Sequence, residues 1–177
     1  MHEIELKILN IDPKAIAAKL KKIGAKKLSD HLVVEKLYDF PNGRLEKSRQ
    51  VCRLRTRGKK LVEFTYKRFI AADANISERE EIETTVGDFE NAEKILLALG
   101  MKVIKYREKK RISFYLGKVH FEIDKFPTIP AYLEIEGSRG DIIKMVKALG
   151  YTMADTTSKV AAEVLKDYGQ NPFYQKF

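Results

Sequence analysis

Hydrophobic and polar residues alternate along most of the chain, as they do in strands with one buried face. In Glu3-Ile4-Glu5-Leu6-Lys7 the charged residues share one face and the apolar residues share the other. Alternating segments of this kind predict eight strands, near residues 2–9, 28–39, 49–58, 60–69, 77–86, 101–115, 118–126 and 131–138. Gly58-Lys59 and Gly117-Lys118 have the composition of hairpin turns between neighbouring strands.

Four segments have helical spacing instead. The first follows Asp12-Pro13, a suitable cap followed by proline at the first helical position, and ends at Gly24. Two more run from Asp88 to Gly100 and from near Asp141 to Gly150, and a C-terminal helix over about 157–168 precedes a short tail. Each has one apolar stripe, so each must pack on a broad apolar surface.

The charged faces of the strands decide the expected fold. One charged strand face is usually solvated, but seven strands carry ionisable groups of both signs on one face. Because the helices need the apolar faces, the charged faces must look inward. We therefore expect an α+β fold: a closed eight-stranded antiparallel β-barrel with helices packed outside and a polar tunnel within. The length of 177 residues predicts one domain over residues 1–177.

The net charge of +9 points to an anionic partner. Lysines on and after the first helix, Lys14 to Lys27, could bind a phosphate backbone, but lysines on an amphipathic helix are usually solvated, and no strand interleaves aromatic and basic residues as RNA-binding strands do. A single cysteine, Cys52, excludes an internal disulfide. No segment has the pattern of a signal peptide or membrane span, so we expect a cytoplasmic protein without a membrane partner.

The two signs of charge in the tunnel suit one kind of ligand. Arginine forks and lysine ammonium groups bind phosphate. Carboxylates bind hard divalent cations such as Mg²⁺ or Mn²⁺, which often bridge to substrate phosphates. Inward residues on one strand lie roughly 6.6–6.8 Å apart, so Glu3/Glu5 and Glu134/Glu136 could flank one or two ions. A triphosphate with bound metal uses both sets of side chains at once.

The same segments resemble a known family. Glu3-Ile4-Glu5-Leu6-Lys7 is similar to the ExExK strand of the CYTH superfamily, the triphosphate tunnel metalloenzymes. Similar segments follow in the family's order over residues 1–165; they are Leu37–Pro41, Cys52–Arg55, Phe64–Lys67, Arg79–Glu83, Lys109–Arg111, Ile123-Asp124 and Ile129–Gly137. The segment Tyr132–Glu136 is most similar to the class IV adenylyl cyclase (CyaB-like) branch.

The resemblance implies roles for the charged residues. The metal ligands would be Glu3, Glu5, Asp124, Glu134 and Glu136. The catalytic residues would be Glu5, Glu134, Glu136 and Lys67. The triphosphate would bind to Lys7, Arg53, Arg55, Lys67, Lys109 and Arg111, and Glu81 and Glu83 would order these bases or help to hold a second metal. The resemblance is also compatible with a homodimer.

The chain departs from the family pattern at two positions. It lacks the His-Phe stretch that bacterial class IV cyclases carry before the ExExK strand, because the strand follows Met1-His2 directly and His2 is too close to it to stand in for that stretch. It has Ser158-Lys159 where the family often has Ser-Tyr. Lys159 is then either an extra phosphate ligand or, as we favour, a solvated helix lysine.

Three functions are compatible with these patterns. We favour a divalent-metal-dependent phosphohydrolase acting on a triphosphate, whether inorganic, nucleoside or other organic. The first alternative is a class IV adenylyl cyclase that converts ATP to cyclic AMP and pyrophosphate. Loops around residues 40–48 and 70–76 would recognise a base, and their sequences do not reveal one. A nucleic-acid or phosphate-binding module without catalysis is the distant alternative.

Overall fold

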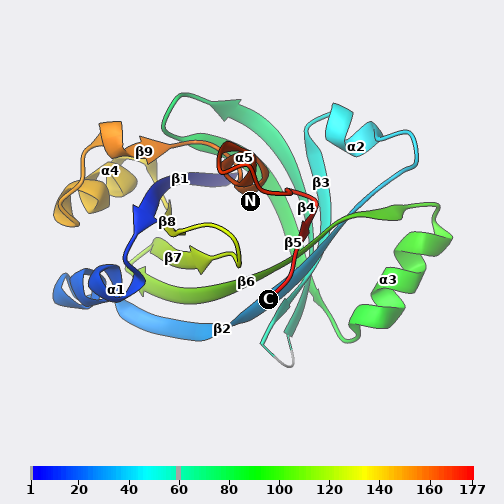
Figure 1. Cartoon of the computed structure of the whole chain (residues 1–177), viewed down its shortest axis with the longest axis horizontal. Helices are drawn as coiled ribbons and strands as arrows, with labels where there is room; N and C mark the ends of the chain where they lie inside the picture. Colours follow the sequence, from blue (N-terminus) through cyan, green and yellow to red (C-terminus); the bar gives the residue numbers. More distant parts are fainter. Residues whose placement is uncertain (1, 59–60) are drawn as a thin grey trace.

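Eight antiparallel strands form a closed ring (Figure 1). The computed structural model describes residues 2–58 and 61–177. Within these residues the strands are β1 (His2–Ile11), β2 (Lys26–Asp39), β3 (Gln50–Arg57), β4 (Leu61–Ala72), β5 (Ser77–Val86), β6 (Lys102–Leu116), β7 (Val119–Lys125) and β8 (Ala131–Glu136). They pair in the order β6-β2-β3-β4-β5-β1-β8-β7, and pairing of β7 with β6 closes the ring. The predicted α+β barrel is confirmed. Of the turn expected at Gly58-Lys59, Lys59 lies outside the described residues.

Five α-helices lie outside the barrel in the described part of the chain. They are α1 (Pro13–Lys22), α2 (Arg44–Lys47), α3 (Phe89–Ala98), α4 (Arg139–Ala148) and α5 (Ala161–Asp167), with a 3₁₀ turn, η1, at Met153–Asp155. Two short strands, β9 (Thr156–Thr157) and β10 (Tyr174–Gln175), extend the sheet. The C-terminal helix is shorter than expected because Thr156 and Thr157 pair with β1. The α2 helix lies in a segment for which we expected a loop.

The predicted ends of the helices follow from capping. The Asp12 carboxylate accepts a hydrogen bond from the Ala15 N–H at 2.8 Å, which satisfies one of the donors that the first turn leaves without a partner. After the last turn Gly24 has φ +90°, a left-handed conformation that glycine adopts without strain. The third expected helix begins earlier than Asp141 because Ser138 caps it.

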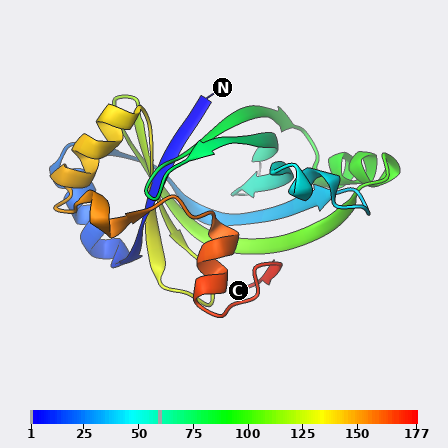
Figure 2. The same ribbon diagram turned by 90° about the horizontal axis from the view of Figure 1, so that it is seen from above.

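The helices cover the apolar outer faces of the barrel. Ile16 of α1 and Ile142 of α4 pack on the face formed by β1, β7 and β8. Leu45 of α2 and Leu96 of α3 pack near the other end of the long strands, beside β2 and β3. Figure 2 shows α1 and α4 at one end of the molecule and α3 at the opposite end. The apolar faces therefore point outward, as the alternation predicted.

The closed ring fixes which strands face one another. In the pairing order, β1 is four strands from β2 in either direction, and β8 is likewise four strands from β3. Side chains that point inward from β1 and β8 therefore approach those from β2 and β3 across the tunnel. None of the helices in residues 2–58 and 61–177 is long and apolar enough to cross a membrane.

Candidate active site in the barrel tunnel

The inward side chains of the strands surround a cavity of about 380 Å³. Its basic lining residues are Lys7, Arg53, Arg55, Arg57, Lys67, Arg79, Lys105, Arg107, Lys109 and Arg111. Its acidic lining residues are Glu3, Glu5, Glu35, Glu81, Glu83, Glu122, Glu134 and Glu136. Every residue that the sequence analysis assigned to the site lines this cavity except Asp124, which lies fully buried beside it. The strands thus bring the predicted set together, and the roles of its members remain predictions.

Asp124 binds two of the predicted phosphate ligands. Its Oδ2 atom lies 2.8 Å from Lys109 Nζ, and its two oxygens lie 2.6 Å from the Arg111 guanidinium. These cations outweigh the effect of burial and hold the pKa of Asp124 below its usual value. Asp124 therefore orders Lys109 and Arg111.

Arg111 and Glu134 are also held by several partners. The Arg111 guanidinium contacts Glu122, Asp124 and Glu134, with Glu134 at 3.0 Å. Glu134 also lies 2.8 Å from Lys7 Nζ. Lys7 and Arg111 keep the pKa of Glu134 well below its usual value despite burial, so Glu134 is ionised at neutral pH.

The carboxylates of Glu3, near the start of β1, and Glu136, at the end of β8, have fewer cationic partners in the described structure than Asp124 and Glu134. Glu3 is 2.6 Å from Lys67 Nζ, yet burial and the neighbouring Glu5 raise its pKa. Glu136 has no hydrogen bond or ion pair with any described residue, and burial together with the charge of Glu3 raises its pKa to about 7. This end of the tunnel therefore carries more negative charge than its protein partners balance.

The acidic cluster suits a divalent cation in its chemistry. Mutual repulsion of Glu3, Glu5 and Glu136 is relieved by a hard cation with oxygen ligands. In the described part of the chain, no three acidic, histidine or cysteine side chains converge on one point. Mg²⁺ fits this arrangement because it is usually held by one or two carboxylates and completes its shell with water and substrate phosphates.

Basic side chains on β3 and β6 are crowded by one another. Burial lowers the pKa of Arg53 and of Lys109, and their cationic neighbours Arg55 and Arg111 lower it further. Arg53 comes from β3, which faces β8 across the ring, and Lys109 comes from β6, which is two strands from β8. The tunnel therefore has basic groups that favour an anion beside an acidic cluster on β1 and β8 that favours a cation.

Several lining residues escaped the sequence analysis. Lys105 and Arg107 alternate in step with Lys109 and Arg111, and this spacing could have revealed them. Glu35 was harder to find because β2 has apolar residues on both faces around it. Arg79, which was seen on the charged face of its strand but given no role, forms an ion pair with Glu5.

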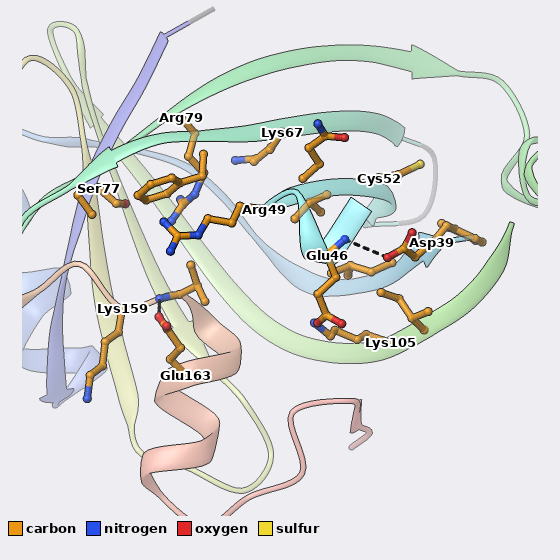
Figure 3. Close-up of a pocket in the computed structure, with 18 of the residues that line it drawn as sticks. Asp39, Glu46, Arg49, Cys52, Lys67, Ser77, Arg79, Lys105, Lys159 and Glu163 are labelled. Atoms are coloured by element: carbon orange, nitrogen blue, oxygen red, sulfur yellow. Dashed lines mark hydrogen bonds and ion pairs between the residues drawn. The ribbon is translucent and has the colours of Figure 1, made fainter. Parts of the chain in front are cut away.

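A second pocket of about 540 Å³ adjoins the tunnel at the end nearest α2 and α5. Lys67, Arg79 and Lys105 line both the pocket and the tunnel, so the two spaces are continuous. Figure 3 shows Lys67 and Arg79 on one side of this pocket and Glu46 with Lys105 on another. We refer to it as the mouth pocket. Its apolar lining includes Val51, Phe69, Ile104 and Val160.

Two other residues considered in the sequence analysis have ordinary surroundings. Lys159 is 49% exposed and lies 2.6 Å from Asp167, but it precedes α5 instead of lying in a helix, and it borders the mouth pocket. Cys52 is buried, and burial raises the pKa of its thiol to about 11.

Comparisons with known proteins agree with this architecture. The sequence profile of the CYTH domain matches residues 1–159. A protein from Pyrococcus horikoshii is 24% identical with a TM-score of 0.75, covering 89% of this chain and 96% of that one. A candidate adenylate cyclase from Vibrio parahaemolyticus is 18% identical with a TM-score of 0.82, covering 94% and 98%. A candidate adenylyl cyclase from Hippeastrum with dominant triphosphatase activity is 14% identical with a TM-score of 0.69, covering 96% and 97%. No protein of the curated set matches this sequence.

Proposed function

Because the chain belongs to the CYTH domain family, we propose that it is a divalent-metal-dependent phosphohydrolase that acts on a triphosphate in the barrel tunnel. The observation that carries this proposal is that buried basic and acidic side chains line one cavity. Burial and a neighbouring cation lower the pKa of Arg53 and of Lys109, whereas burial and a neighbouring carboxylate raise the pKa of Glu3 and of Glu136. A phosphate chain with a divalent cation satisfies both sets of side chains.

The proposed reaction is attack of water on the terminal phosphorus. The bond from that phosphorus to its bridging oxygen breaks, and the departing phosphate chain keeps the electron pair. We assign the stabilisation of charge on the phosphoryl oxygens to Arg53, Arg55 and Lys109. We assign the uptake of the water proton to Glu136, which has no partner among the described residues.

We assign the metal to one or two carboxylates of the cluster formed by Glu3, Glu5 and Glu136, with Glu134 ordering Lys7 beside them. When bound, Mg²⁺ or Mn²⁺ would polarise the phosphoryl oxygens and make water more acidic. Lys67 bridges Glu3 at 2.6 Å and Glu81 at 3.4 Å, so it fixes the position of the acidic cluster relative to β4 and β5.

The mouth pocket favours an organic triphosphate over an inorganic one. Its volume of about 540 Å³ falls within the roughly 300–1,000 Å³ typical of sites for small organic molecules. Apolar and polar groups both line it, so a ring system with hydrogen-bonding groups would fit. The same pocket is why adenylyl cyclase is the second candidate, because cyclisation of ATP requires that the nucleoside be bound in a fixed orientation.

The test is product analysis of the purified protein. ATP and inorganic triphosphate are supplied separately, each with Mg²⁺ or Mn²⁺. We expect orthophosphate release, and we expect Glu134→Ala to slow it by roughly 100-fold or more. Glu90→Ala, which changes an exposed carboxylate on α3, should leave the rate unchanged.

The products separate the candidates. Formation of cyclic AMP and pyrophosphate from ATP would contradict the phosphohydrolase and show that the protein is an adenylyl cyclase. An absence of turnover of both compounds with either metal would contradict the proposed reaction on these substrates. Orthophosphate release that persists undiminished in Glu134→Ala would overturn the role assigned to Glu134.

A further inference from the structure

We propose that Arg107 is a further substrate-binding residue and that Glu35 positions it beside Arg53, so that the two arginines form an oxyanion site in the tunnel wall. The inference rests on the proposed function in one respect, namely that the anion is a phosphate of the substrate. Neither Arg107 nor Glu35 belongs to the motif residues to which the sequence analysis gave roles.

The geometry around Glu35 links the two arginines. Glu35 lies on β2 directly opposite Arg107 on β6, and its side chain is 2% exposed. Its Oε1 atom lies 2.7 Å from Arg107 Nη2, and its Oε2 atom lies 3.6 Å from Arg53 Nη1. One buried carboxylate therefore holds two guanidinium groups that come from different strands.

Both arginines retain donors that nothing in the described structure accepts. A guanidinium has five N–H donors, and Glu35 is the one ion-pair partner that Arg107 has among the described residues. The Nε atoms of Arg53 and Arg107 are buried without a hydrogen-bond partner. Buried donors without acceptors are costly. An oxyanion between the two side chains would supply the acceptors.

Arg111 shows the contrasting case. Asp124, Glu122 and Glu134 surround its guanidinium, so three acidic groups share one cation. Around Glu35 one carboxylate is shared by two guanidinium groups, and the further contact of Arg53, with Glu83, is longer at 4.0 Å. Burial and the neighbouring Arg55 lower the pKa of Arg53. The two arginine forks with spare donors suit phosphate oxygens, which accept paired hydrogen bonds from arginine.

The position of Arg107 indicates which phosphate it binds. It lies between Lys109, deeper in the tunnel, and Lys105, which also lines the mouth pocket. Alternate residues of a strand are separated by roughly 6.6–6.8 Å. The site formed by Arg53 and Arg107 thus lies near the mouth pocket, where the phosphate attached to the organic group would enter the tunnel.

The experiment measures binding of tripolyphosphate by calorimetry without divalent metal, so that turnover plays no part. We expect Arg107→Gln to weaken binding roughly 10- to 100-fold, because charge-assisted hydrogen bonds are lost. Arg68→Gln is the matched control. Arg68 is an exposed arginine on β4 that pairs with Glu80 outside the tunnel, and its replacement should leave the affinity unchanged.

A double-mutant cycle tests the positioning role of Glu35. Glu35→Gln alone should weaken tripolyphosphate binding, whereas adding it to Arg107→Gln should cost less, because only the longer contact with Arg53 is then left to lose. A merely structural role for Glu35 would give the same loss of affinity in both backgrounds, and that result would overturn the positioning role.

Folding is checked by thermal unfolding of each variant. If Arg107→Gln does not fold, Arg107→Lys decides the question, because it keeps the charge beside Glu35 but loses the planar fork. Unchanged affinity in a folded Arg107 variant, or no tripolyphosphate binding by the unmodified protein, would overturn the inference. Binding that depends on Arg107 without any hydrolysis would contradict the proposed function and support the inference.

Discussion

Glu35 lies between Arg107 and Arg53 with almost no contact with water, so its ionisation depends on the folded state. Burial alone would raise its pKa, but Arg107, Lys109 and Arg53 hold the pKa far below the usual value of a glutamate. In the unfolded chain the carboxyl group takes up a proton at a higher pH than in the folded protein. Its contribution to stability is therefore present above about pH 4.5 and is lost as the pH falls.

Glu35→Gln should lower the free energy of unfolding at pH 7 by about 3–5 kcal/mol, because two buried guanidinium groups lose their counter-charge. At pH 3 the difference should be smaller by about 2 kcal/mol, since each pH unit below 4.5 removes about 1.4 kcal/mol. Urea unfolding at both pH values measures the effect. An equal loss at pH 7 and pH 3 would show that Glu35 has no depressed pKa.

At the scale of elements, α2 depends on one carboxylate rather than on its own turns. Asp39 is 1% exposed and accepts hydrogen bonds from the N–H groups of Phe40, Leu45 and Glu46 at 2.7–3.0 Å. These donors lower its pKa. Asp39 thereby fixes the segment that carries Glu46 and Arg49 to the mouth pocket. The helix is too short for periodicity to predict it.

Asp39→Ala should destabilise the protein by about 2–3 kcal/mol, because three backbone donors, of which that of Leu45 is buried, lose their acceptor. The same change should raise the KM for ATP more than the KM for inorganic triphosphate, since only ATP would use the mouth pocket. Asp39→Asn retains one acceptor oxygen and should cost less in both respects. Chemical unfolding and steady-state kinetics measure the two effects. Equal changes in the two KM values would argue against a role for the mouth pocket in substrate choice.

At the scale of the whole molecule, the tunnel and the exterior differ in charge. Ten basic side chains line the tunnel, and its eight acidic side chains are joined by Glu63 and Asp124, which pair with Arg55 and Arg111. These groups cancel, so the formal net charge of +9 belongs to the rest of the chain. Exposed lysines on α1 contribute to it.

Replacing Lys14, Lys21 and Lys22 by glutamine should leave triphosphate turnover within about twofold at 0.15 M salt, because exposed charges more than about 8 Å away are screened. At low salt the variant should have a lower kcat/KM, since long-range attraction of the anionic substrate is weaker. Kinetics over a salt series measure both effects. A loss of turnover at 0.15 M salt comparable with that of Glu134→Ala would contradict this prediction, because it would show that the lysine face takes a direct part in substrate binding.

The sequence by itself determined the inward and outward faces of most strands. When polar and apolar residues alternate, all the apolar side chains lie on one face, and that face must be the one that packs against the helices. It also determined the helix ends at Asp12 and Gly24, where capping is local. The charged strands in their order were enough to indicate the family and the members of the candidate site. Arg107 escaped although its spacing was visible, because an alternating arginine has the same pattern whether or not its charge is balanced.

Only the tertiary structure decided how each tunnel charge is neutralised. Arg111 meets Asp124 and Glu134, which are 13 and 23 residues away along the chain, and is saturated by them. Arg107 meets Glu35 across the β2–β6 pair and retains unused donors. Whether a charge is neutralised depends on its distances to charged side chains on several other strands. The closed ring sets these distances, and the residue types along one strand cannot specify them.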